Sequence, residues 1–161
     1  MVLRAFAVIA AAALLLPAPH AQAGEVIVGA GHSFHRGDPS DGGMVVSLEL
    51  RGPVVGQLGQ GRIMPMMVAD VHRLGDSFFG MGVAVRWDME AGWFLDAGVA
   101  PGAYRDGMAA RGIARGVQVR SHLSMGWDIG QRQALSVAVV HTSGNSGAGM
   151  QTVLMRWHQG F

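Results

Sequence analysis

Apolar and polar side chains alternate along several stretches of this chain, and this alternation constrains the fold more than any other sequence feature. The clearest case is "VQVRSHLSMGWD", residues 117–128. One parity is apolar: Val117, Val119, Leu123, Met125 and Trp127. The other parity is polar: Gln118, Arg120, His122, Ser124 and Asp128. A period of two residues places the two sets on opposite faces of a β-strand, so the pattern predicts an all-β chain.

The same pattern recurs in regular segments separated by turn residues. It predicts strands at 25–34, 44–51, 62–73, 77–88, 92–104, 115–129, 133–143 and 150–161. Pro65 makes the third the weakest, since proline cannot donate to the ladder. Alternating segments of about 10 residues are typical of transmembrane barrels, and eight strands close into a small barrel filled by side chains. The sequence therefore predicts an eight-stranded antiparallel transmembrane β-barrel.

A soluble sandwich or lipocalin-like barrel, with its apolar face turned inward, is the alternative reading of the alternation. Two features favour the membrane. Large aromatic side chains stand at the ends of the predicted strands, where interfacial girdles form; they are Trp87, Trp93, Trp127 and Phe161. The polar face also carries too many charges for a soluble core, because buried charges must be paired.

The N-terminal segment "MVLRAFAVIAAAALLLPAPHAQA" differs from the rest of the chain. Arg4 precedes an apolar run that ends at Leu16, and prolines and a small-residue "AQA" follow. This order is typical of a secretory signal peptide, and the run is shorter than the roughly 20 residues of a transmembrane helix. We expect cleavage of a signal peptide at 1–23, and a barrel domain at 24–161 in the outer membrane of a Gram-negative bacterium.

The charge balance limits the classes of partner. The chain has 12 basic and 11 acidic residues, without the basic stripe or the interleaved aromatics of a nucleic-acid-binding surface. It has no cysteine, so no disulfide framework holds the exported chain together. The sequence leaves a homodimer open.

The segment "HTSGNSGAGMQ" carries polar residues on the parity that faces lipid elsewhere in the chain. The termini and short turns of such barrels lie at the periplasm, which places this segment at the outer-leaflet end. His141, Ser143 and Gln151 share the parity of Val137 and Val153. Polar groups on the lipid face are costly away from the interface, so their presence points to a function.

From His141 to the C-terminus, "HTSGNSGAGMQTVLMRWHQGF" resembles the lipid A 3-O-deacylases of Gram-negative outer membranes, which are eight-stranded barrels with a His-x-Ser motif near the end of strand seven. His141 and Ser143 match that motif, and Gly149 to Gln151 fall on the family's Gly-x-Glu. The segments "GWFLDAGVAPGAY" and "RGVQVRSHLSMGWDIGQRQALSVAVVH" are similar to its strands five to seven. The resemblance covers most of residues 77–161.

The resemblance implies hydrolysis of the ester-linked 3-O-acyl chain of lipid A, with lipopolysaccharide and outer-membrane lipids as partners and neither metal nor other cofactor. Ser143 would be the nucleophile and His141 the general base. Gln151 occupies the position of the family's acid; its amide oxygen could orient the imidazole but supplies no charge. Gly144 stands where the family has asparagine, and Asn145 follows one place later. Together with Gly149, these two are the loop candidates for oxyanion stabilisation.

Several alternatives remain open from the sequence. Barrel closure would place the first outer loop, "HSFHRGDPSDGG", beside the last strand, so Asp38 or Asp41 could supply the missing carboxylate. His32 and His35 are read as residues of that loop, because no further ligand pattern accompanies them. The rival functions are an inactive relative, a non-enzymatic barrel that stabilises the membrane or binds a partner through its loops, and a soluble lipid-binding barrel.

Overall fold

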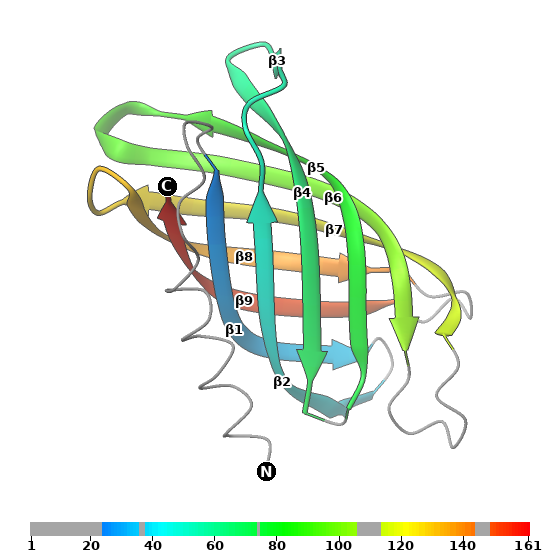
Figure 1. Cartoon of the computed structure of the whole chain (residues 1–161). Coiled ribbons are helices and arrows are strands. Elements are labelled where there is room, and N and C mark those ends of the chain that lie inside the picture. The colour runs from blue at the N-terminus through cyan, green and yellow to red at the C-terminus, as the bar shows by residue number, and fades with distance from the viewer. Residues whose placement is uncertain (1–23, 36–37, 74, 106–113, 144–148) are drawn as a thin grey trace.

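The computed structural model describes residues 24–35, 38–73, 75–105, 114–143 and 149–161, so the expected signal peptide lies outside the described residues. Nine strands and one 3-10 turn follow each other in this part of the chain (Figure 1). They are β1 (Glu25–His35), β2 (Asp38–Arg51), β3 (Gly56–Leu58), β4 (Gly61–His72), β5 (Ser77–Asp88), η1 (Glu90–Gly92), β6 (Trp93–Arg105), β7 (Ala114–Asp128), β8 (Gln133–Thr142) and β9 (Met150–Gly160).

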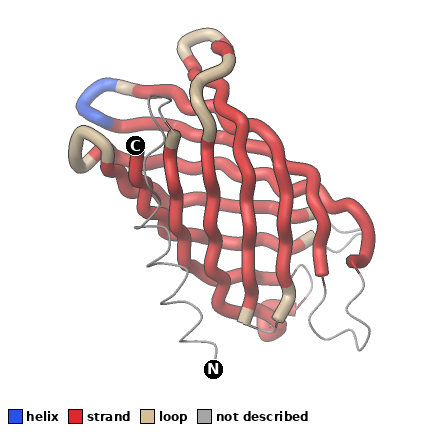
Figure 2. Tube along the Cα trace, in the orientation of Figure 1, coloured by secondary structure: helices blue, strands red, loops and turns tan. Residues whose placement is uncertain are grey.

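All neighbouring strands pair antiparallel, and the sheet closes on itself (Figures 1 and 2). β1 pairs with both β2 and β9, and β2 pairs with β4, so eight strands form a closed barrel. β3 pairs with β4 alone and forms a hairpin above the barrel in Figure 1. The predicted fold, an all-β barrel of eight antiparallel strands, is confirmed.

Both ends of the described barrel lie at one rim, which we call the terminal end. Gly24 N–H donates to the carbonyl of Phe161 at 3.2 Å, and Phe161 N–H donates to that of Gly24 at 3.0 Å. The turn containing η1 and the turn after Asp128 lie at the same rim. We call the opposite rim the outer end, since the termini of such barrels lie at the periplasm.

The first connection between strands is shorter than the sequence predicts. β1 runs to His35 and β2 begins at Asp38, six residues before the predicted start at Met44. His32 therefore lies in a strand instead of a loop, and Asp41 is part of β2. Alternation of apolar residues reveals a strand only where one face is apolar, whereas ladder pairing needs only backbone groups. For the same reason the three-residue β3 left no pattern to detect.

Pro65 is tolerated inside β4 because the pairing of β4 with β2 ends at Met66, the residue next to it. The carbonyl of Pro65 accepts a hydrogen bond from Gly52 N–H at 2.9 Å. In a strand the nitrogen of a residue points to the same side as its carbonyl, so the Pro65 nitrogen faces Gly52, just past the last β2–β4 pair, Arg51 with Met66. The missing N–H of proline therefore removes no ladder bond from the barrel.

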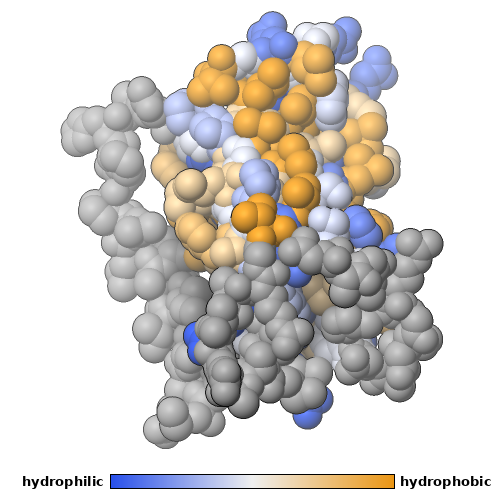
Figure 3. All heavy atoms as spheres, turned by 90° about the vertical axis from the view of Figure 1, so that its right-hand side faces the viewer, coloured by the Kyte–Doolittle hydropathy of each residue, from blue (hydrophilic) through white to orange (hydrophobic). Residues whose placement is uncertain are grey.

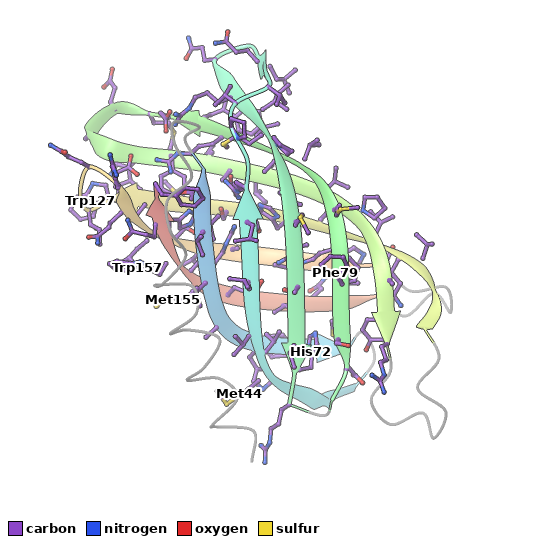
Figure 4. The ribbon with its side chains drawn as sticks, in the orientation of Figure 1. Met44, His72, Phe79, Trp127, Met155 and Trp157 are labelled. Carbon is purple, nitrogen blue, oxygen red and sulfur yellow. The ribbon has the colours of Figure 1, made fainter. Side chains whose placement is uncertain are left out.

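The outer surface of the barrel is apolar along the strands, as the alternation predicts. Figure 3 shows apolar side chains gathered over one side of the barrel, with hydrophilic ones at the upper, terminal end. Trp127 and Trp157 lie near that end in Figure 4, and both are exposed. An exposed apolar belt with aromatics near one rim is suited to contact with lipid. In the described part of the chain, no helix is long and apolar enough to cross a membrane.

A network of ion pairs occupies part of the barrel interior, beside buried apolar clusters that contain Phe78 and Leu154. Asp96 is fully buried and accepts hydrogen bonds from both terminal nitrogens of Arg51 and, at 2.8 Å, from Nε2 of His122. Glu49 pairs with Arg51 at 2.7 Å and with Arg156 at 3.0 Å. Opposite charges therefore face each other across the interior, which is how a buried set of charges is tolerated.

Two histidines of the polar strand faces, His122 and His158, are buried in the interior. His122 lies against Gly98, where a Cβ atom would collide with its ring, and His158 bonds the Ser136 hydroxyl at 2.8 Å and the Glu25 carboxylate at 3.0 Å. Both side chains belong to the polar part of the packed lumen.

Candidate functional site

Three polar side chains meet on the lipid-facing surface near the outer end of neighbouring strands. His141 of β8 is paired with Gln151 of β9 on one side and with Ser121 of β7 on the other. His141 and Gln151 are exposed on the outer face, and Ser121 is partly exposed there. The same row continues to Phe34 of β1, the partner of Gln151. Directly opposed side chains on one face have Cβ atoms about 5 Å apart, so the imidazole is within reach of both neighbours.

Ser143 lies one residue beyond the end of β8 and continues its pairing with β7. Its N–H donates to the carbonyl of Val119 at 2.9 Å. Its hydroxyl donates to the same carbonyl at 3.2 Å and accepts from Val119 N–H at 3.1 Å. The side chain is exposed on the outer face with His141, two residues earlier.

The structure places His141, Ser143 and Gln151, all of them described, near one another, but their side chains are not hydrogen-bonded to each other. The Ser143 hydroxyl is instead held by the backbone of β7. A serine must pass its proton to a base to become nucleophilic, so a nucleophilic Ser143 would have to release Val119 and bond the His141 ring.

Gly149 stands against the imidazole of His141. A Cβ atom at this position would lie 2.5 Å from Cε1 and 3.2 Å from Nε2 of the ring. Glycine therefore leaves the space that the ring occupies. This contact assigns Gly149 a steric role beside the His141 ring, whereas Gly144 and Asn145 lie outside the described residues.

The Gly149→Ala variant is expected to turn the His141 ring away from its present position while leaving the β8–β9 ladder paired. Displacement of a catalytic group by about 1 Å can cost roughly a hundredfold in rate. Any ester hydrolysis that depends on His141, measured on purified folded barrel, should fall by that order. Wild-type activity in Gly149→Ala would show that the present ring position is not the working one.

Asp38 and Asp41 are the two carboxylates that could replace the missing acid of the triad, and the structure gives the positions of their backbones in β2. Asp38 pairs with His35, and His35 pairs with Met150 of β9. Asp38 therefore lies two strands away from Met150, in the same row of paired residues. Gln151 belongs to the neighbouring row. Asp41 lies further along β2. In the described part of the chain, no group of three or more metal-binding side chains is arranged to hold a metal ion.

Sequence reasoning missed two polar residues on the lipid face near the outer end. Ser121 stands between Val119 and Leu123 on the apolar parity of β7 and is partly exposed. His32 is exposed on the outer face of β1, with its ring centroid 4.8 Å from that of Phe34. The alternation itself carries the signal for Ser121, because a hydroxyl interrupts an otherwise apolar series.

No protein-family model matches this chain, and no curated protein matches its sequence. Solved structures match its fold. The outer membrane enzyme PagL superposes with a TM-score of 0.64 at 13% identity, over 84% of this chain and 98% of that one. Neisserial surface protein A superposes with a TM-score of 0.61 at 10% identity, over 88% of this chain and 100% of that one.

A de novo designed transmembrane β-barrel also matches, with a TM-score of 0.58 at 10% identity, over 85% of this chain and 95% of that one. At such identities the likeness shows the fold alone, and a designed barrel among the matches illustrates that this fold does not determine a function. The chain has the fold of the small eight-stranded outer-membrane β-barrels.

Proposed function

We propose that this protein is a lipid A deacylase that hydrolyses the ester-linked 3-O-acyl chain of lipid A in the outer leaflet. The observation that carries the proposal is the gathering of His141, Ser143 and Gln151 on the exposed outer face, near the outer ends of β8 and β9. A lipid lying beside the barrel would present its ester group to this surface. A hydroxyl, an imidazole and an amide are the groups that serine-type ester hydrolysis uses.

In the proposed reaction, the Ser143 hydroxyl turns from Val119 towards His141. Its oxygen attacks the ester carbonyl carbon while His141 accepts the proton. The tetrahedral intermediate collapses, the bond to the sugar oxygen breaks, and His141 returns the proton to that oxygen. Water, deprotonated by His141, then attacks the acyl-serine; its bond to the Ser143 oxygen breaks, His141 returns the proton to that oxygen, and the fatty acid is released. Gln151, paired with His141, would orient the ring through its amide oxygen.

Two likenesses support the proposal. The segment from His141 to Phe161 resembles the lipid A 3-O-deacylases around their His-x-Ser motif. PagL, whose fold matches over most of this chain, is an outer membrane enzyme. The position of the polar residues on the lipid-facing surface fits a substrate that is itself a membrane lipid.

Mass spectrometry of lipid A from cells that produce the folded wild-type protein tests the proposal. Folding is verified first, by heat-modifiable migration of the protein in the outer-membrane fraction. We expect a lipid A species lacking one ester-linked 3-acyl chain. Unchanged lipid A beside a folded barrel would contradict the proposal and favour a non-enzymatic barrel.

The Gln151→Glu variant is expected to deacylate faster than wild type. A carboxylate at the cross-strand partner of His141 would stabilise the imidazolium formed in the transition state. By analogy with the loss of one preorganised group, the gain could reach about 3 kcal/mol in activation free energy. Initial rates on purified lipid A measure the effect.

The outcome also decides between sources of charge. If Asp38 or Asp41 already supplies it, a second carboxylate nearby raises the pKa of one of them, so Gln151→Glu would give no gain, and Asp38→Asn or Asp41→Asn would be damaging. If none of the three variants changes the rate, the third group is wrongly assigned, and the enzyme works with His141 and Ser143 alone.

A further inference from the structure

Ser121 is a hydroxyl on the lipid-facing surface that the mechanism above does not use. Its neighbours on the same face of β7, Val119 and Leu123, are exposed apolar residues. Its Oγ donates to the carbonyl of His141 at 3.5 Å, which is at the limit of a hydrogen bond. The hydroxyl is therefore weakly held on a surface where an apolar side chain would be less costly.

The ladder places Ser121 beside both proposed catalytic residues. It is the direct cross-strand partner of His141. Ser143 bonds the backbone of Val119, two residues before Ser121, so Ser121 and Ser143 are diagonal neighbours on one face. Such neighbours have Cα atoms about 5 Å apart when direct and 7–8 Å apart when diagonal. An ester group held over Ser143 and His141 would lie within reach of the Ser121 side chain.

Among the described residues, the two backbone N–H groups beside Ser143 are engaged before the reaction, and the turn of the Ser143 hydroxyl towards His141 would release that of Val119. Val119 N–H donates to the Ser143 hydroxyl, and Ser143 N–H donates to the Val119 carbonyl. The attacked carbonyl oxygen becomes negatively charged in the transition state and needs donors placed to receive it. Ser121 can offer a further donor by rotation about a single side-chain bond.

We propose that Ser121 is a further catalytic residue of this site, whose hydroxyl donates a hydrogen bond to the carbonyl oxygen of the acyl ester. The bond strengthens as Ser143 attacks and the oxygen gains charge, and it weakens again when the sugar oxygen leaves. No covalent bond to Ser121 forms. The inference rests on the proposed deacylase function and names the part of the substrate, the ester carbonyl, that β7 recognises.

The test compares Ser121→Ala, Ser121→Thr and Ser77→Ala with wild type, as purified folded barrels acting on lipid A in mixed micelles. Ser77 is a partly exposed serine on the outer face of β5, outside the site, and serves as the matched control. Removing one oxyanion donor costs about 10²–10³ in kcat, and we expect a loss of that order in Ser121→Ala with KM unchanged. Ser121→Thr keeps the hydroxyl and should recover most of the rate, and Ser77→Ala should match wild type.

Each other outcome overturns the inference in a recognisable way. Wild-type kcat in Ser121→Ala, beside an active wild type, removes Ser121 from the site and leaves the deacylase proposal standing. A change in KM alone assigns Ser121 to ground-state binding instead. A loss that threonine does not restore, or that follows reduced heat-modifiability, marks a structural role. Absence of deacylation by wild type overturns the proposed function and this inference together.

Discussion

Cells producing Ser143→Ala or His141→Ala are expected to retain lipid A with its full set of acyl chains, while the barrel still folds. The two residues act as a unit, because without the base the hydroxyl is a weak nucleophile, and without the hydroxyl the base has no attacking group. Removing either member of a working serine–histidine pair costs roughly 10⁶ in kcat. Deacylation should therefore fall below detection in each single variant and in the double variant alike.

Mass spectrometry of lipid A gives the readout, and heat-modifiable migration shows that each variant is folded. Both side chains are exposed on the outer face, so their truncation removes little packing. Ser77→Ala again provides the control for removal of an outward hydroxyl. Persistent release of the 3-linked chain by folded Ser143→Ala would rule out Ser143 as nucleophile and direct attention to Ser121.

The Asp96→Ala variant is expected to lose most of its stability. Asp96 is fully buried, and its carboxylate holds Arg51, His122 and Arg156. Removing one partner of a buried ion pair leaves an uncompensated charge and costs about 3–5 kcal/mol of unfolding free energy. The glutamate that also contacts the two arginines, Glu49, would limit the loss.

Urea titration of the barrel in lipid, followed by heat-modifiable migration, measures this change. Arg62→Ala is the matched control, since the Arg62–Asp88 pair is about half exposed, with side-chain exposures of 45% and 46%. An exposed pair contributes about 0–1 kcal/mol. Equal losses in Asp96→Ala and Arg62→Ala would show that the network in the lumen is hydrated and adds little to stability.

The face of each strand could be predicted from the sequence, because alternation is a property of the local backbone. Successive side chains of a strand point to opposite sides whatever the strand pairs with. This is why the polar parity of residues 117–128, His122 among it, was expected on the face opposite to lipid, where the structure places it. It is also why His141, Ser143 and Gln151 were expected on the lipid-facing surface, where the structure places them. The same pattern predicted the number of barrel strands. It did not predict β3, which has only three residues.

The register between strands could not be predicted, and the details of the site depend on it. Ser121 is twenty residues from His141 in the chain and becomes its neighbour only through the β7–β8 ladder. The bonds between the Ser143 hydroxyl and Val119, and the early start of β2 at Asp38, also arise from pairing between backbones. The sequence by itself determined which side chains face lipid and which face the lumen. The tertiary structure alone decided which of them meet, because hydrogen bonds between strands set the register over the whole closed sheet, and alternation within a single strand carries no information about it.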